Sequence, residues 1–221
     1  SNVGLPQEVL LCWRIFSDLE PTKMSKRYKK PDHFTRKAKK EGFAARSVYK
    51  LEEIQRRFHL FKPGMKVVDL GCYPGSWSKY LIQQVGRNGS VVGVDLSAPR
   101  FGGGQWIERS VFDVTVEELL IALDGNADVV VSDMAPATTG NRLGDHVLQI
   151  ELADRAWQIA TQILKPKGSF VAKVFDGEEA NDYCARVKAQ CAKTKRLKPE
   201  ATRRQSREFF LVGQGFQPVS S

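Results

Sequence analysis

Short runs rich in β-branched residues alternate with amphipathic segments along most of this chain, and this alternation limits its fold more than any other feature. The runs cover residues 66–71, 90–96, 127–133, 168–175 and 208–213, with a weaker one at 106–109. The segments around 76–86, 145–164 and 178–192 have the apolar spacing of helices. Strands that alternate with helices predict an α/β fold, in which helices cover both faces of a mainly parallel sheet.

Length and composition indicate one main domain. A chain of 221 residues, 42% hydrophobic and 27% charged, can bury one sizeable core. We expect an N-terminal extension and basic arm at 1–31, whose first two residues resemble the remnant of a cleaved tag, a main domain at 32–215 and a tail at 216–221. No apolar run approaches the roughly 20 residues that cross a bilayer. Cysteines and histidines form no zinc or disulfide pattern. We therefore expect a cytoplasmic monomer without a metal or a membrane contact.

Positive charge is concentrated in two segments. Residues 23–50 contain eleven Lys or Arg and two acids, and residues 186–207 contain nine and one. The two segments together carry a net charge of +17, so the remainder of the chain carries −8. Basic segments beside an acidic body are typical of enzymes that bind a polyanion, because phosphate contacts supply much of the affinity. A merely soluble charged surface is the alternative interpretation.

A glycine-rich turn follows the first clear strand. Gly71 and Gly75 are spaced G-x-x-x-G with Pro74 between them, and a helix follows. Such a turn lets a ligand approach the backbone at the carboxyl edge of the sheet. A nicotinamide dinucleotide would need G-x-G-x-x-G for its pyrophosphate, so the spacing favours a nucleoside cofactor without phosphates. Asp95, which ends the second strand, is a candidate ligand of the ribose. Asp113 is either a second ligand or an ordinary loop residue.

Two other strand ends carry polar residues that packing does not explain. Asp133 ends the run at 127–133, and Lys173 interrupts the apolar run at 168–175. Lysine is almost never fully buried without a partner or a function. Lys50 falls on an early helix that is predicted from the candidate N-cap Ser47 and from apolar spacing to Phe58. With Asp133 and Lys50 nearby, Lys173 could be held neutral and ready to accept a proton.

These segments together resemble the FtsJ-type (RlmE) family of ribosomal RNA large-subunit ribose 2′-O-methyltransferases. The resemblance runs from about residue 32 to residue 213. The strings that carry it are ARSVYKLEEIQ (45–55), FKPGMKVVDLG (61–71), PGSWS (74–78), SDMAP (132–136), GSFVAKVF (168–175) and SREFFLV (206–212). It implies a Rossmann-like methyltransferase fold with a seven-stranded sheet, and it implies S-adenosylmethionine as the cofactor with S-adenosylhomocysteine as the product.

The resemblance also implies a catalytic tetrad, whose matching positions are Lys50, Asp133, Lys173 and Glu208. Matched in the same way, contacts to the cofactor fall on Gly75, Trp77, Asp95, Asp113 and Asp133, and Gly71 belongs to the same turn. The chain departs from the family pattern at Cys72-Tyr73, where small residues are usual, and at Ser76, where the family has a glycine. Residues 137–145 also differ from the best-known bacterial members.

We expect Lys173 to accept the proton of the ribose hydroxyl, Asp133 and Glu208 to orient the two lysines, and Lys50 to stabilise the oxyanion or position the ribose. The expected partner is a structured RNA, namely large-subunit ribosomal RNA within the ribosomal particle, with a uridine as the target. Candidate RNA contacts are Lys37, Lys39, Lys40, Arg46, Arg203, Arg204 and Arg207. Transfer RNA or a messenger RNA cap is the main alternative substrate. A catalytically silent RNA-binding assembly factor is another, although no tetrad residue is missing.

Overall fold

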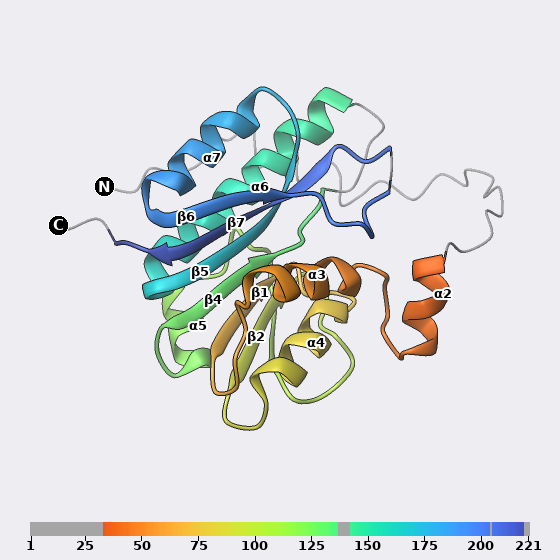
Figure 1. The fold of residues 1–221 in the computed structure, drawn as a ribbon. Coiled ribbons are helices and arrows are strands. Elements are labelled where there is room, and N and C mark those ends of the chain that lie inside the picture. The colour runs from red at the N-terminus through yellow and green to blue at the C-terminus, as the bar shows by residue number, and fades with distance from the viewer. Residues whose placement is uncertain (1–32, 137–141, 204, 219–221) are drawn as a thin grey trace. The chain divides into compact units, whose positions relative to one another are not determined.

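In the computed structural model, which describes residues 33–136, 142–203 and 205–218, seven strands pair in one sheet in the order β3-β2-β1-β4-β5-β7-β6 (Figure 1). They are β1 Lys66–Leu70, β2 Ser90–Asp95, β3 Gln105–Glu108, β4 Ala127–Ser132, β5 Leu164–Phe175, β6 Cys191–Leu197 and β7 Glu208–Phe216. Strands β1 to β5 pair in parallel, whereas β7 runs antiparallel to both β5 and β6. The predicted α/β class with a mainly parallel, seven-stranded sheet is confirmed.

Helices cover both faces of the sheet, as Figure 1 shows. They are α2 His33–Lys40, α3 Val48–Phe58, α4 Ser76–Val85, α5 Val116–Leu123, α6 Arg142–Ile163 and α7 Glu179–Ala189. Side chains of α3 and α4 pack in one apolar cluster with one face of the sheet, and side chains of α5, α6 and α7 pack with the other face. Val67 and Val68 of β1 are both fully buried, one in each cluster. Burial on both faces explains why the central strands are continuous apolar runs.

The sequence did not predict strand β6, and it extended the preceding helix too far. We expected a helix at 178–192, but α7 ends at Ala189 and the chain pairs with β7 from Cys191 onward. Strand β6 is an edge strand with the sequence CAKTKRL, and its lysines are exposed. Lysine on an edge strand discourages pairing with other chains, but it also removes the apolar run that marks a strand. The pattern of β6 is therefore typical of a solvated loop.

Three local features also differ from expectation. Helices α2 and α5 were not predicted, although α5 has a complete capping box between Thr115 and Glu118. The prediction that the Ser47 side chain caps α3 is wrong, because Ser47 has helical backbone angles and its hydroxyl makes no cap hydrogen bond. The N-terminal extension and basic arm at 1–31 lies outside the described residues. No helix among the described residues is long and apolar enough to span a membrane.

Candidate active site

The carboxyl edge of the sheet collects the four residues of the predicted tetrad. Asp133 follows directly after β4, and Lys173 lies near the end of β5. Because β7 is antiparallel to β5, its first residue, Glu208, lies opposite Phe175 at this same edge. Lys50 reaches the edge from the first turn of α3. The structure therefore brings all four residues together, and it arranges them as two lysine–carboxylate pairs.

The first pair joins Lys50 to Glu208, whose positions are 158 residues apart in the chain. The Lys50 ammonium donates to Glu208 Oε1 and lies 5.5 Å from the centroid of the Phe210 ring. Both side chains are at least 86% buried. Burial alone would raise the pKa of Glu208, but the charge and hydrogen bond of Lys50 and the charge of Lys173 lower it overall. Glu208 therefore interacts electrostatically with both lysines.

The second pair joins Lys173 to Asp133. Lys173 Nζ donates to the backbone carbonyl oxygen of Asp133 at 2.6 Å and lies 3.0 Å from its Oδ1. The contact between the Asp133 carboxylate and the Lys173 ammonium lacks hydrogen-bonding geometry, so it is purely ionic. The buried Oδ1 of Asp133 therefore accepts no hydrogen bond from the described residues. The Lys173 side chain is 7% exposed. Its amine is consequently oriented by a neutral carbonyl dipole as well as by a charge.

Gln149, which the sequence did not single out, supports Lys173 from α6. Its amide Nε2 donates to the Lys173 carbonyl oxygen at 2.6 Å, and its Oε1 accepts from Phe175 N–H at 2.8 Å. Strand β4 ends at Ser132, which lies opposite Ala172, so the last residues of β5 have no strand beside them on that side. The buried Gln149 side chain replaces the missing strand there. A lone glutamine in an amphipathic helix gives no sequence signal for such a role.

The two glycines of the predicted cofactor turn both have positive φ. Gly71 and Gly75 have φ values of +84° and +100°, backbone angles that residues other than glycine rarely adopt. A Cβ at Gly71 would lie 2.6 Å from a side-chain atom of Met134, so the turn also packs closely against the segment after β4. Asp95 Oδ2 accepts from Tyr73 N–H at 3.0 Å. Asp95, the last residue of β2, therefore fixes the turn.

Asp69 is a second residue that the sequence analysis missed. It lies within β1 and is completely buried, and its Oδ2 accepts from the Ser78 hydroxyl at 2.6 Å. Its Oδ1 has no hydrogen-bond partner among the described residues. Burial, above all, and the charges of Asp133 and Asp95 raise the pKa of Asp69 to about 7, although the Ser78 bond opposes this. Three strand ends thus bring three carboxyl groups close enough to influence one another.

Trp77 and Ser76 connect this turn to the segment that carries Lys50. The Trp77 indole is 3% exposed, donates to the Ser47 carbonyl oxygen at 2.9 Å and packs 5.6 Å from Phe210. The Ser76 hydroxyl accepts from Ala45 N–H at 2.6 Å. The departure from the usual glycine at 76 therefore has a local structural role. The Trp77 indole is therefore engaged in contacts within the protein.

Asp113 lies exposed in the loop before α5. Arg155 of α6 holds this loop, donating to the carbonyl oxygens of Val111 and Val114 at 2.9 Å and 3.0 Å. Burial lowers the pKa of Arg155, and the charge of Asp113 opposes that shift. The position of Asp113 beside the sheet edge therefore depends on a long-range contact with α6 that the sequence pattern does not reveal.

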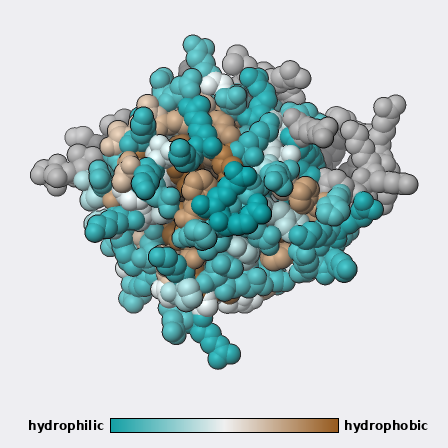
Figure 2. Space-filling view, in the orientation of Figure 1, coloured by the Kyte–Doolittle hydropathy of each residue, from teal (hydrophilic) through white to brown (hydrophobic). Residues whose placement is uncertain are grey.

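The predicted RNA contacts fall on two surfaces near this edge. Lys37, Lys39 and Lys40 are exposed on the last turn of α2, and Arg203 and Arg207 are exposed between β6 and β7. Arg46 donates to the Ala201 carbonyl oxygen at 2.8 Å and so links the two surfaces. Arg204 lies outside the described residues. Figure 2 shows that hydrophilic side chains cover most of the face that carries α3 and α4.

Because residues 186–207 lead directly into Glu208, the sequence predicts that this basic segment flanks the site, but only part of it lies at this edge. Helix α7 begins at the carboxyl edge and ends at the opposite one, and β6 then runs back in the direction of β5. Arg186, Lys188 and Lys193 therefore lie at the far edge of the sheet. The residues between the end of β6 and Glu208 are the part that approaches the site.

Comparison with known proteins identifies the family of this chain. The model of the FtsJ-like methyltransferase family matches residues 43–216, which include all four tetrad positions. The chain belongs to the FtsJ-like methyltransferase family. Among FtsJ-like relatives, "Ribosomal RNA large subunit methyltransferase E" of Desulfatibacillum aliphaticivorans is 48% identical over 185 residues, which cover 82% of this chain and 89% of that protein. The protein of the same name from Bdellovibrio bacteriovorus is 43% identical over 190 residues, which cover 84% and 97%.

A solved structure supports the FtsJ-like fold. The crystal structure of a Plasmodium falciparum protein described as a ribosomal RNA methyltransferase aligns with a TM-score of 0.71, over 80% of this chain and 100% of that one. At 24% sequence identity, this similarity concerns the fold alone.

Proposed function

We propose that this chain transfers a methyl group from S-adenosylmethionine to the 2′-hydroxyl of a ribose, at a uridine of large-subunit ribosomal RNA. The observation that carries the proposal is the pair of buried lysine–carboxylate contacts, Lys50–Glu208 and Lys173–Asp133, at the cofactor edge of the sheet. Burying charged groups costs free energy even when they are paired, so two such pairs gathered at one edge indicate a functional site. The names of the bacterial relatives support the choice of substrate.

The residues at this edge fit S-adenosylmethionine. The cofactor carries positive charge on its sulfonium and its amino group, and Asp69, Asp95 and Asp133 place three carboxyl groups at the ends of adjacent strands, where a cation would favour their ionised forms. The partnerless Oδ1 of Asp69 is a buried acceptor that a cationic ligand could satisfy. Asp95 has one carboxylate oxygen committed to Tyr73 N–H, which leaves the other for a ribose hydroxyl.

When bound, the cofactor supplies a methyl group that its sulfonium already activates. The protein therefore has to remove a proton from the ribose hydroxyl and to align the reacting atoms. Lys173, after its ammonium has released one proton to solvent, accepts the hydroxyl proton at Nζ, and the Asp133 carbonyl oxygen, 2.6 Å away, fixes the direction of the amine. Lys50, held by Glu208, stabilises the developing charge on the ribose oxygen. Because one chain provides all four residues, we propose that a monomer is active.

Transfer of labelled methyl groups tests this function. Purified 50S subunits, naked large-subunit RNA and bulk transfer RNA are incubated with labelled S-adenosylmethionine and with wild type, Lys173→Ala or Lys165→Ala. Lys165 is a matched control, because it lies on β5 but contacts Asp128 at 2.7 Å, far along the strand from Asp133. We expect a labelled 2′-O-methyl nucleoside in ribosomal RNA with wild type and Lys165→Ala, and no label with Lys173→Ala.

Other results contradict particular parts of the proposal. Label in transfer RNA alone would preserve the chemistry and overturn the substrate. An unchanged single-turnover rate in Lys173→Ala would remove Lys173 from the role of base. Cofactor binding without label in any RNA would favour a catalytically silent RNA-binding function.

A further inference from the structure

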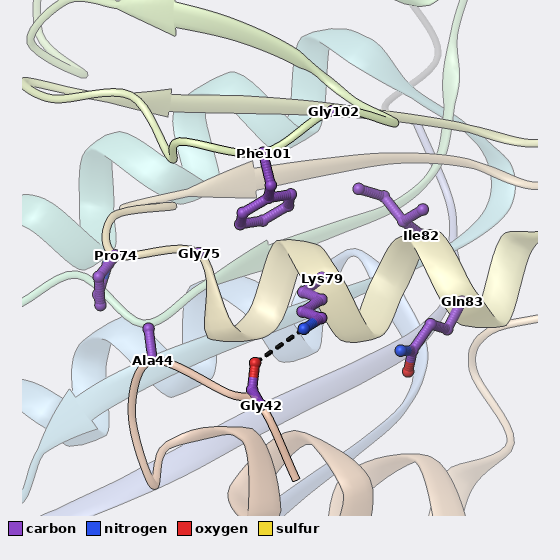
Figure 3. A pocket seen from close by; sticks show the side chains of 9 residues that line it. All are labelled: Gly42, Ala44, Pro74, Gly75, Lys79, Ile82, Gln83, Phe101 and Gly102. Atoms are coloured by element: carbon purple, nitrogen blue, oxygen red, sulfur yellow. Dashed lines mark hydrogen bonds between the residues drawn. The ribbon is translucent and has the colours of Figure 1, made fainter. Parts of the chain in front are cut away.

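A groove on the outer side of the cofactor turn is separate from the tetrad. It has a volume of about 360 Å³ and lies between the loop at 42–44, residues 79–83 of α4 and the loop at 101–102 (Figure 3). None of the four tetrad residues lines it. Ala44 and Pro74 face each other at one end of the groove, and Ile82 and Gln83 lie at the other. Pro74 belongs to the cofactor turn, so the groove leads to the edge of the active site.

Phe101 gives this groove a rigid aromatic wall. Its ring packs against Gly75, where a Cβ would come within 2.4 Å of a ring carbon. Trp106 holds it from the other side, with ring centroids 5.4 Å apart and with an indole hydrogen bond of 3.1 Å to the Phe101 carbonyl oxygen. The half-buried ring is therefore fixed in place. A fixed aromatic wall favours stacking, because little conformational entropy is lost when a flat ligand binds.

The charge of the groove favours an anion. Lys79 lines it, and no carboxylate does. Lys79 Nζ donates to the Gly42 carbonyl oxygen at 2.8 Å, a contact drawn in Figure 3, and this uses one of its three hydrogens. The loop at 42–44 follows directly after α2, where Lys39 and Lys40 are exposed and have no ion pair with the described residues. The nearby carboxylate of Glu41 forms an ion pair with Lys37 at 3.8 Å and accepts from the Tyr49 hydroxyl at 2.7 Å, so its charge is balanced by a neighbouring lysine.

We infer that this groove binds a nucleotide of the RNA next to the methylated one, with the base against Phe101 and the phosphate near Lys79 and the end of α2. The inference rests on the proposed function, since it assumes an RNA substrate. An aromatic wall beside a cation is the arrangement that recognises unpaired nucleotides, whose bases stack while their phosphates contact basic side chains. The volume also lies within the range of sites for small organic groups, which is roughly 300–1,000 Å³.

The test measures binding of a fluorescein-labelled single-stranded RNA 12-mer of mixed sequence by anisotropy, and binding of S-adenosylmethionine by calorimetry. Phe101→Leu removes the stacking surface and should weaken RNA binding roughly 5- to 150-fold, the range given by one stacked base. Phe101→Tyr keeps the ring and should bind RNA as wild type does. The affinity of both variants for S-adenosylmethionine should stay within about twofold of the wild-type value.

A pair of isosteric variants keeps the test valid if Phe101→Leu folds poorly. Gln83→Glu places a negative charge at the groove, whereas Gln84→Glu makes the same change at the next residue of α4, which does not line it. Gln83→Glu should weaken RNA binding roughly two- to fivefold more than Gln84→Glu. Equal losses in the two variants, or RNA affinity retained in Phe101→Leu, would overturn the inference. A loss of S-adenosylmethionine affinity alone would assign the groove to the cofactor and also overturn it.

Methyl transfer is not a readout in this test. If the proposed function is wrong, the wild type will bind RNA here but transfer no methyl group in the separate methyl-transfer assay. If the inference about the groove is wrong, these variants will bind RNA as tightly as the wild type does.

Discussion

Lys173 Nζ lies 2.6 Å from the backbone carbonyl oxygen of Asp133 and 3.0 Å from its Oδ1, so two groups of one residue hold the amine. Sheet register produces this contact. Ser132 and Ala172 are partners in the parallel β4–β5 pair, and Asp133 and Lys173 are the residues that directly follow these partners in the chain. The position of the proposed base therefore depends on the register at the carboxyl end of the β4–β5 pair.

Gln149→Ala should destabilise the protein and slow methyl transfer. The variant leaves the Lys173 carbonyl and the Phe175 N–H buried without partners, and each such group costs about 1–3 kcal/mol. Urea unfolding measures the loss of stability. Because Gln149 positions Lys173 and touches no substrate, kcat should fall while KM for S-adenosylmethionine changes little.

Gln158→Ala is the matched control for this prediction, since Gln158 is exposed on the same helix. It should change neither stability nor kcat. If Gln149→Ala and Gln158→Ala changed stability and kcat to the same extent, the hydrogen bonds of Gln149 would have no special role. Packing of α6 against β5 would then position Lys173 without them.

Removing one partner of the Lys50–Glu208 pair should cost more than removing both. Lys50→Met leaves the Glu208 carboxylate largely buried without its cation, which costs about 3–5 kcal/mol. Lys50→Met combined with Glu208→Gln leaves no uncompensated charge and should recover part of that stability. Denaturant unfolding of the two single variants and the double variant gives a coupling energy of about 0.5–3 kcal/mol for contacting residues. Additive losses would show that the pair is not coupled.

The sequence predicted which residues gather at the carboxyl edge better than it predicted the helices and strands around them. Lys173 was recognisable because a lysine inside an apolar strand needs a special environment, and β5 supplies one. Gly71 and Gly75 were recognisable because a glycine-rich turn between a strand and a helix lets a ligand approach the backbone, and both have positive φ in the structure. Such residues violate the local pattern, and the violation is visible without a structure.

Residues that satisfy the local pattern were missed. Asp69 in KVVDL appears as an ordinary strand residue, and only the structure reveals its complete burial and its partnerless oxygen. Gln149 and Arg155 act through contacts between α6 and distant backbone. The sequence did not predict strand β6, because an edge strand can pair with its neighbour even when its residues are polar. Tertiary contacts decided each of these cases.

Stability should decrease as the pH rises from about 4 to about 7, in a manner that depends on Asp69. Its pKa is raised from 3.8 to about 7 in the folded protein. Between these two pH values the folded state retains a proton on Asp69 that the unfolded state has lost. The stabilisation from this proton is therefore fully present below the pKa of the unfolded state, and it is lost as the pH rises through the pKa of the folded state. The slope is at most about 1.4 kcal/mol per pH unit.

Asp69→Asn isolates this contribution, because asparagine can still accept from the Ser78 hydroxyl and does not titrate. Urea unfolding of both proteins across this pH range gives the difference in stability. The wild type should lose stability relative to Asp69→Asn as the pH rises. Parallel pH profiles would show that Asp69 titrates near its ordinary value.

The salt dependence of RNA binding should identify which basic residues contact phosphates. Lys39 and Lys40 lie on α2 near the active site, whereas Lys188 and Lys193 lie at the opposite edge of the sheet. Each lost phosphate contact lowers the slope of log K against log salt by about 0.7–0.9. Replacing Lys39 and Lys40 by alanine should therefore reduce the slope by up to about 1.8. Replacing Lys188 and Lys193 removes the same charge and should leave the slope nearly unchanged. Equal reductions in the two double variants would mean that RNA binding follows total charge, and that the α2 surface has no special role.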